Sequence, residues 1–554
     1  MKNALPTPFP HGADVSRDFN PAIRLFGKRF IIDQPIPEYL LEFLVIVNSR
    51  KAIGDVNEGV TSPFPTLEQI KNWPKSALLS YEPTVRLNLK LFAFLSSSRI
   101  DSRHDIHRAQ YEKLWKGLQR RINSTRDDTE DVVEWLEDLL KGFRGAGLNR
   151  TWCAQSFFPV AASLLAPETI WNETVVKTKP VASWESSVES FGTYYSLYRY
   201  NFLARGGEVL YLQLCNVFAQ EQRRTEEFAR SFAFTAAERD LEQLHAALQL
   251  GFESLYGGHD LAIDNLADFI EGIDPDTIRA IDKQMRKFEC GWCPADSWKE
   301  GYLFAVEVKR LLHTAIDPVE KLELLMTGCA LQVLRSMCAQ SVRYLGCGTA
   351  GEKYSEDYSS GGGLGYSLIF TPVMNPTRHL QLTSQRNLQA VLGLIQKVLR
   401  TGSLIENAKC APSKRTLPKI LKEADDKYGY KLFRALGKKL GIVVPYKGPG
   451  ARFAMTDDLL RYFVLTLLEP GESCTYDAFL DRLYANHGIA VEGNNLRNAI
   501  DWSNLPPNLS TEYDDSSWLR EMLRAGGFLT ELSDGYSIVT NTFEKVQMRG
   551  SRER

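Results

Sequence analysis

The sequence predicts a mainly α, multi-domain protein: a helical body followed by C-terminal tandem winged-helix (α+β) modules. Its 554 residues exceed the roughly 150 residues of an ordinary domain several-fold. Apolar residues make up 44% and charged residues 24% of the chain, a composition typical of globular proteins that excludes general disorder and a membrane bundle. Helical periodicity runs through most of the sequence, and strand–turn–strand patterns occur near its end.

Amphipathic spacing and helix-start signals predict the helices of the body. Residues 131–143 carry apolar side chains at helical spacing, with acidic residues between them. Thr235 and Glu238 have the spacing of a capping box, in which each side chain accepts a hydrogen bond from the backbone of the other. Asp317 precedes residues 319–345, which are apolar around much of the helix circumference. That pattern predicts a central buried helix.

Composition suggests where the domains end. Residues 346–365 are rich in glycine and serine, which predicts a linker or loop ahead of a differently charged C-terminal third. The predicted parts are an N-terminal helical domain (1–150), a central helical domain (151–345), a linker and connecting segment (346–384), a basic winged-helix-like module (385–456) and an acidic winged-helix-like module (457–545).

The two C-terminal modules end in the same pattern. In the first, a helix over residues 431–440 is followed by a β-branched run at 442–444, a Gly-Pro-Gly turn and a strand at 452–455. In the second, a helix at 517–525 precedes another strand–turn–strand pattern. A helix followed by a tight hairpin is the ending of a winged-helix module.

Charge separates these two modules. Between Lys409 and Arg452 the chain carries 12 basic and 3 acidic residues, within a protein whose formal net charge is −2. From Asp457 to Glu544 it carries 15 acidic residues, 5 arginines and no lysine. Such segregation inside a near-neutral protein indicates two surfaces with different partners.

The basic module is predicted to contact double-stranded DNA. Clustered cations release condensed counterions from phosphates, and a helix can enter the major groove while a basic wing follows the backbone. The alternatives are a solvated face, an intramolecular complement to the acidic module, or a protein partner. The predicted DNA-binding residues are Lys414, Arg415, Lys419, Lys431, Arg434, Lys438, Lys439, Lys447 and Arg452. The acidic module would repel DNA and is predicted to dock other proteins.

Two motifs suggest metal or redox chemistry. Cys290 and Cys293 form a C-x-x-C motif that could bind zinc or act as a redox pair, with buried thiols as the alternative. His104 and His107, near Asp101, could bind a transition metal from one helix face or simply begin a polar helix. The sequence shows no P-loop, zincin or hydrolase motif. We therefore expect no catalytic residues and no cofactor, with zinc as the one candidate.

A polar and aromatic set could line a pocket in the helical body. Its residues supply ionic and stacking groups, and the alternative is a buried polar network that holds helices together. The candidate pocket residues are Arg150, Trp152, Gln155, Asn201, Arg205 and Glu208.

The sequence predicts a cytoplasmic protein without a membrane partner. Prolines at positions 6, 8 and 10 interrupt the region where a signal peptide needs an apolar helix. The most apolar early stretch, residues 39–47, is about half the length needed to cross a bilayer. Nine cysteines, an odd number, suit a reducing compartment.

Three stretches carry a resemblance: NRTWCAQSF at 149–157, NFLARGGE at 201–208 and CGWCPADSW at 290–298. Together they resemble large, mostly helical, poorly characterised bacterial proteins encoded in phage-defence islands, beside modification or ATPase genes. The resemblance implies a role in antiviral defence and partners among other defence proteins, including an ATPase. It assigns no chemical role to individual residues.

These observations lead to one expected function and two alternatives. We expect a non-enzymatic DNA-binding and scaffolding subunit of a bacterial anti-phage defence complex, which contacts duplex DNA through the basic winged helix. One alternative is a metal-dependent, nuclease-like enzyme built on the helical core. The other is a protein-binding regulator without DNA affinity.

Overall fold

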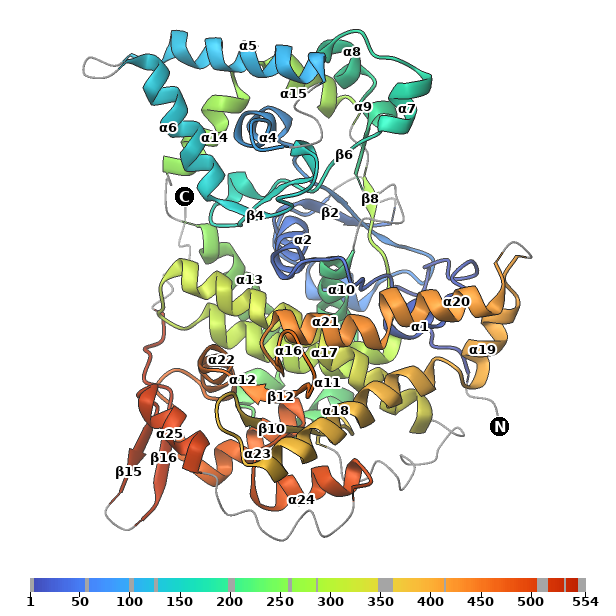
Figure 1. The fold of residues 1–554 in the computed structure, drawn as a ribbon, viewed down its shortest axis with the longest axis vertical. Coiled ribbons are helices and arrows are strands. Elements are labelled where there is room, and N and C mark those ends of the chain that lie inside the picture. Colours follow the sequence, from blue (N-terminus) through green and yellow to red (C-terminus); the bar gives the residue numbers. More distant parts are fainter. Residues whose placement is uncertain are drawn as a thin grey trace.

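The computed structural model is mainly α, as the sequence predicts, with short strands gathered into small sheets. Figure 1 shows three tiers of helices stacked along the longest axis of the molecule. The structure describes residues 4–54, 59–98, 104–123, 128–197, 205–257, 262–284, 287–346, 362–412, 415–505, 517–532 and 535–546.

The upper tier surrounds a compact core of aromatic and aliphatic side chains drawn from residues 87–197 and 267–281. Helix α4, buried along its whole length, lies at the centre of this tier, and α5 and α6 cover it. The helices of the upper tier are α4 (Leu87–Phe94), α5 (Asp105–Arg121), α6 (Thr129–Gly142), α7 (Glu173–Thr178), α8 (Trp184–Glu189), α9 (Phe191–Tyr194), α14 (Ala262–Glu271) and α15 (Pro275–Asp282). Its strands are β4 (Arg144–Ala146), β5 (Ser156–Phe157), β6 (Ile170–Trp171) and β7 (Tyr195–Ser196).

The middle tier is built around α17, the helix that the sequence predicts to be central and buried. In α17, 83% of the most apolar 18-residue window is buried; by length and composition it is the one helix in the described part of the chain that could cross a membrane. The helices here are α1 (Pro21–Phe26), α2 (Ile36–Asn48), α3 (Leu67–Lys71), α10 (Gly206–Phe218), α11 (Gln222–Ala229), α12 (Ala236–Arg239), α13 (Leu241–Tyr256), α16 (Trp298–Leu312) and α17 (Pro318–Gly346). The strands are β1 (Pro8–Phe9), β2 (Arg50–Ile53), β3 (Leu79–Glu82), β8 (Phe288–Glu289) and β9 (Cys293–Pro294).

The C-terminal third forms the lower tier, except that residues 402–439 lie at the height of the middle tier (Figure 1). Its helices are α18 (Arg378–Val398), α19 (Gly402–Lys409), α20 (Leu417–Glu423), α21 (Tyr430–Lys439), α22 (Asp457–Leu467), α23 (Tyr476–His487), α24 (Gly493–Trp502) and α25 (Ser517–Ala525). Its strands are β10 (Leu368–Pro372), β11 (Val443–Val444), β12 (Arg452–Met455), β13 (Ser473–Thr475), β14 (Ile489–Ala490), β15 (Leu529–Glu531) and β16 (Ser537–Thr540). They form two sheets, of order β11-β12-β10-β14 and β13-β16-β15.

Both hairpins predicted at the ends of the modules are present. Val443 and Val444 pair antiparallel with Phe453 and Arg452, and β15 pairs antiparallel with β16. Strand β10, however, lies within the predicted connecting segment and pairs in parallel with both β12 and β14. The two predicted modules therefore share one sheet.

The cores divide the chain differently from the predicted boundaries. Residues 9–81 pack into the large core of the middle tier, whereas the residues from Leu87 onward begin the upper core, so the predicted first domain contributes to both. The predicted boundary between residues 384 and 385 lies inside α18. Most of the glycine-rich stretch 346–365 is outside the described residues.

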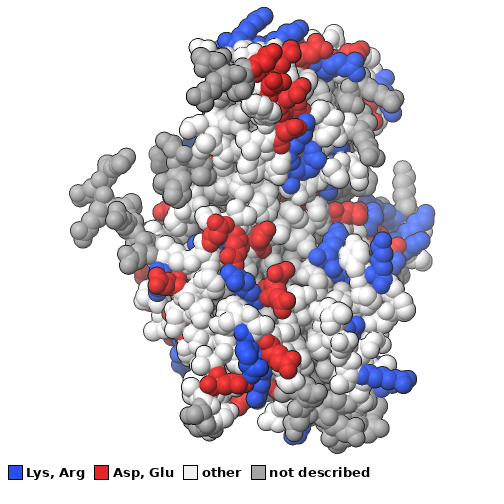
Figure 2. Space-filling model, turned by 60° about the vertical axis from the view of Figure 1, so that its left-hand side comes forward, with Lys and Arg blue, Asp and Glu red and all other residues white. Residues whose placement is uncertain are grey.

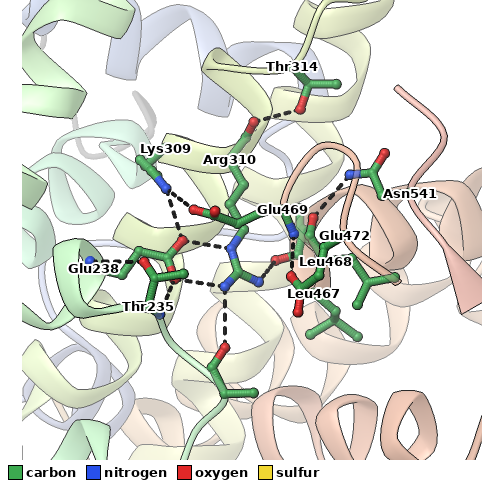
Figure 3. A network of polar contacts seen from close by, with 12 residues as sticks. Thr235, Glu238, Lys309, Arg310, Thr314, Leu467, Leu468, Glu469, Glu472 and Asn541 are labelled. Atoms are coloured by element: carbon green, nitrogen blue, oxygen red, sulfur yellow. Dashed lines mark hydrogen bonds and ion pairs between the residues drawn. The ribbon is translucent and has the colours of Figure 1, made fainter. Parts of the chain in front are cut away.

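A buried ion network joins the lower tier to the middle tier (Figure 3). Arg310 of α16 donates hydrogen bonds to both carboxylate oxygens of Glu238, at 2.7 and 2.8 Å, and to the carbonyl of Thr466 in α22 at 2.9 Å. Lys309 bridges Glu238, at 3.1 Å, and Glu469, at 2.5 Å. Because breaking one partner would leave a buried charge, this network fixes the C-terminal third on the body.

A second buried network joins the same tiers. Arg335 of α17 pairs with Glu307 of α16, and Tyr462 of α22 donates to the other oxygen of Glu307 at 2.9 Å. The Nδ1 atom of His487 in α23 lies 2.9 Å from Arg335, and its Nε2 atom lies 3.3 Å from Glu307. Burial, and then the neighbouring Arg335, hold the pKa of His487 well below its usual value, so the ring is neutral.

Candidate nucleic-acid interface

Helix α21 is amphipathic, and its polar face is basic. Its buried residues are Leu432, Phe433, Leu436 and Gly437. Lys431, Arg434 and Lys438 stand at positions i, i+3 and i+7, which places them on one face of the helix, away from that core. Lys431 and Arg434 are exposed and Lys438 is half-buried. The hydrophobic side thus anchors the helix and presents a row of cations outward.

The hairpin after α21 is held close to it. Gly441, with φ of +82°, takes the left-handed conformation that ends the helix. A Cβ atom at Gly437 would lie 2.9 Å from Val443, so glycine is needed for the strand to approach. The Lys438 ammonium donates a hydrogen bond to the carbonyl of Tyr446 at 2.9 Å. The hairpin turn therefore has a fixed position relative to the basic face.

The turn itself projects into solvent. Tyr446 is 61% exposed and Lys447 is also exposed. Gly448 and Gly450 have positive φ angles of +101° and +80°, which shape the tight turn. An exposed aromatic ring and a lysine in a hairpin turn supply a group that can stack on a base and a cation that can contact a phosphate.

Helices α20 and α21 follow one another across the front of the molecule (Figure 1). Arg415 precedes α20, and Lys419 and Lys422 stand one turn apart on it; all three are exposed. At 1.5 Å per residue, the segment from Leu417 to Lys439 spans at most about 35 Å. In Figure 2 mostly basic side chains project at mid-height on the right-hand edge, to which the rotation brings this front face.

The acidic residues of this segment are already paired. Lys427 lies 3.3 Å from Glu423, and Lys431 lies 2.6 Å from Asp426. Asp425 pairs with Arg400 of α18. Within the described residues, seven cations of the segment have no carboxylate partner: Arg415, Lys419, Lys422, Arg434, Lys438, Lys439 and Lys447. We refer to these seven residues as the basic track.

Arg452 is placed differently from the other predicted DNA-binding residues. It is 8% exposed, and it donates hydrogen bonds to the Thr371 hydroxyl at 3.1 Å and the Val373 carbonyl at 2.8 Å. Its guanidinium therefore joins β12 to the end of β10 and is not available to a phosphate. Lys431 is exposed but paired with Asp426. Lys414 lies outside the described residues.

Arg150, one of the candidate pocket residues, belongs to a buried network along α2. Arg150 lies 2.6 Å from Glu38 of α2 and 2.8 Å from Glu168. Burial, with the nearby Glu168, raises the pKa of Glu38 to about 8 despite the opposing charge of Arg150. One turn further along α2, Glu42 accepts a hydrogen bond from the backbone of Gly207 at 2.8 Å. This arrangement agrees with the alternative to a pocket, a buried polar network that holds helices together.

The remaining pocket candidates also have internal partners. Arg205 forms a 2.6 Å ion pair with Glu208, which accepts a hydrogen bond from the Tyr81 hydroxyl at 2.8 Å. Trp152 donates to His107 at 3.2 Å, and Gln155 is fully buried. Asn201 lies outside the described residues.

Cys290, Cys293 and His107 are buried, and His104 is half-buried. Burial raises the pKa of the thiols of Cys290 and Cys293 above the ordinary value, which disfavours the thiolate that metal binding and redox exchange require. His107 packs edge-on against Trp152 and Trp171. Within the described part of the chain there is no group of three or more His, Cys, Asp or Glu side chains placed to hold a metal ion. Asp101 is not among the described residues.

Sequence reasoning missed two parts of this region. Tyr446 was not a candidate, although an aromatic residue beside a Gly-Pro-Gly turn has few ways to be buried. Lys422 has the i+3 spacing from Lys419 that places both on one face of α20. That spacing was readable from the sequence.

Comparisons of the chain with family models, with curated proteins and with solved structures gave no match.

Proposed function

We propose that this protein binds double-stranded DNA through the basic track and serves as a non-enzymatic scaffolding subunit of a bacterial anti-phage defence complex. The supporting observation is that seven cations of one short segment have no carboxylate partner in the part of the chain that the structure describes, while the three acids of that segment are each paired. Unpaired surface cations in a row are the groups that displace counterions from a phosphate backbone.

In this proposal the C-terminal third acts as tandem winged helices. Helix α21 takes the role of the recognition helix, and the β11–β12 hairpin takes that of the wing. The second module has the helix and strand order of a winged helix. Its elements are α22, β13, α23, α25, β15 and β16, with β14 and α24 inserted. The segment spans at most about 35 Å, which is about one turn of the DNA duplex, so the track can contact phosphates within a single turn.

The proposal places the complex in the bacterial cytoplasm, with partners among other defence proteins, including an ATPase. The resemblance of the 149–157, 201–208 and 290–298 stretches to proteins of phage-defence islands supports this context. The joints at Glu238–Arg310 and Glu307–Arg335 support the scaffolding part, because they couple the DNA-binding third firmly to the body.

The test compares two variants of equal charge. In one, five cations of the track are replaced by glutamine: Arg415, Lys419, Arg434, Lys439 and Lys447. In the control, five exposed cations elsewhere are replaced by glutamine: Lys75, Lys116, Arg120, Arg223 and Lys283. Binding to a fluorescent 20-base-pair duplex of arbitrary sequence is measured by anisotropy.

We expect the track variant to lose at least about 100-fold in affinity and the control less than about threefold, because only local phosphate contacts differ between them. Equal losses in both variants would mean that net charge alone attracts DNA. No measurable binding by the unaltered protein at low salt would reject the proposed function.

A further inference from the structure

A groove lies in the lower tier, at the opposite end of β12 from the hairpin turn of the basic track. Its volume is about 820 Å³, which is in the range of pockets that hold ligands or peptide side chains. Three segments line it: the loop from β10 to α18, the junction of β12 with α22, and one face of α25. The lining residues used below are Val373, Met374, Asp457, Trp518, Glu521 and Met522.

Helix α25 packs on the core through four apolar side chains, and two of these are also partly open to the groove. Leu519 and Leu523 are fully buried. Trp518 and Met522, also four residues apart, are half-buried and line the groove. Half-buried apolar side chains that line an open groove leave apolar surface for another molecule to cover.

The loop that follows β10 lines the groove with two exposed apolar side chains. Met374 is 74% exposed and Val373 is 37% exposed, both in the loop that follows β10. Exposed large apolar side chains that border a concavity mark interaction sites, and methionine adapts its shape to different partners.

The charged side chains of the groove indicate which kind of partner it can bind. Asp457 and Glu521 are the charged side chains among the lining residues, and both are acidic. Both are exposed, and neither makes an ion pair within the described residues. An apolar groove with an unpaired acidic rim is complementary to an apolar segment flanked by lysine or arginine.

We propose that this groove docks a short amphipathic segment of a partner protein, whose apolar side chains lie against Trp518, Met522 and Met374 and whose basic side chain meets Asp457 and Glu521. The site is separate from the basic track, so it adds to the proposed function a specific surface for assembly. The occupant resembles the helix-in-groove class of recognition, in which residues at i and i+4 act as anchors.

The experiment uses the full chain and two fluorescein-labelled peptides of 14 residues, one of leucine and lysine and one of leucine and glutamate in the same amphipathic pattern. The groove variants are Glu521→Lys and Met374→Asp. Their matched controls are Glu134→Lys on α6, and Leu532→Asp beside β15, where Leu532 is 44% exposed. All four positions are on the surface, so the variants are expected to fold.

We expect the leucine–lysine peptide to bind the unaltered protein. Each groove variant should lower the affinity for this peptide at least about tenfold, and each control should change that affinity less than about twofold. The leucine–glutamate peptide is expected to bind at least about tenfold more weakly. Peptide binding should change the tryptophan fluorescence of the protein, and Trp518→Phe should remove that change. DNA affinity should be the same in all four variants, so that failure here is distinct from failure of the proposed function.

Three results would overturn the proposal. Equal binding of the leucine–lysine peptide to groove and control variants would mean non-specific attraction to acidic surface. Equal binding of both peptides would remove the charge argument. Dissociation of a dimer by Met374→Asp in sedimentation would make the occupant a second copy of this chain.

Discussion

Lys438 of α21 donates a hydrogen bond to the carbonyl of Tyr446, 2.9 Å away at the base of the hairpin turn. One side chain thus supplies a cation to the basic track and fixes the hairpin against the helix. The two roles can be separated because the adjacent Lys439 is exposed and has no such bond among the described residues.

We therefore expect Lys438→Met to weaken DNA binding more than Lys439→Met. Both variants lose one charge, but only the first releases the hairpin, so its affinity should fall about 10-fold and that of the other about threefold. Hydrogen exchange of residues 446–451 should accelerate in the Lys438 variant alone. Identical affinities and exchange rates in the two variants would contradict the coupling.

Arg452 is expected to act on stability and not on DNA binding. Arg452→Met leaves the Val373 carbonyl and the Thr371 hydroxyl without their donor, at a cost of about 1–3 kcal/mol. The midpoint of denaturant unfolding should fall while the salt dependence of DNA binding is unchanged. A reduced salt dependence would place this guanidinium on the DNA.

The Glu238–Arg310 ion pair between the tiers predicts how the stability of the protein depends on pH. Burial opposes the charge of Glu238, but hydrogen bonds and charge from Arg310 and then Lys309 outweigh burial and lower the pKa to about 2, from an ordinary 4.5. Because the folded pKa is the lower one, this stabilisation is complete above about pH 4.5 and is lost as the pH falls towards 2.

Glu238→Gln should accordingly destabilise the protein at pH 7 by about 3–5 kcal/mol, since it leaves Arg310 buried without a counter-charge. The loss should shrink below pH 4. Chemical unfolding followed by fluorescence at pH 7 and pH 3.5 checks this, and an equal loss at both values would contradict the assigned charge state.

His487 predicts a second pH effect, in a different window. Its ring is neutral in the folded protein and faces Arg335, Glu307, Tyr462 and Phe463. Since its folded pKa lies well below the ordinary 6.5, the unfolded chain binds a proton first, and stability falls as the pH drops below about 6.5.

The measurement is the melting temperature of the protein and of His487→Gln between pH 8 and pH 5. Carboxyls with raised pKa values, such as Glu38 at about 8, change stability in the opposite direction in both proteins, so the difference between the two curves isolates the histidine. The variant should lose less stability than the parent between pH 6.5 and pH 5. Parallel curves would contradict the neutral ring.

The sequence was informative where local chemistry decides the structure. The capping box of Thr235 and Glu238, the buried helix over residues 319–345 and the two C-terminal hairpins were predicted correctly. Each follows from turn residues, caps or periodicity within a few turns of chain.

Most of the contacts and strands that the sequence did not predict depend on pairing between residues far apart in the chain. Glu238 meets Arg310 and Arg310 meets Thr466 across large sequence separations, which no local pattern encodes. The sequence predicts a connecting segment where β10 lies, because the two partners of this strand, β12 and β14, lie far along the chain. Trp135, on the apolar face of α6, is 58% exposed, since burial depends on neighbours as well as on periodicity.

The candidate site divides in the same way. The clustering of charge between Lys409 and Arg452 identified the cations of α20 and α21 except Lys422, and those cations are exposed or half-buried. Arg452 could not be separated from them, because its burial depends on the carbonyl of Val373 at the end of a strand that the sequence did not predict.

The salt dependence of DNA binding tests the central claim most directly. If the seven cations of the basic track contact phosphates, the logarithm of the association constant should fall with the logarithm of salt concentration with a slope of about −6. The five-site track variant should show a slope of about −2, and the matched control should keep that of the parent. A parent slope near zero, or equal slopes in parent and track variant, would contradict the account.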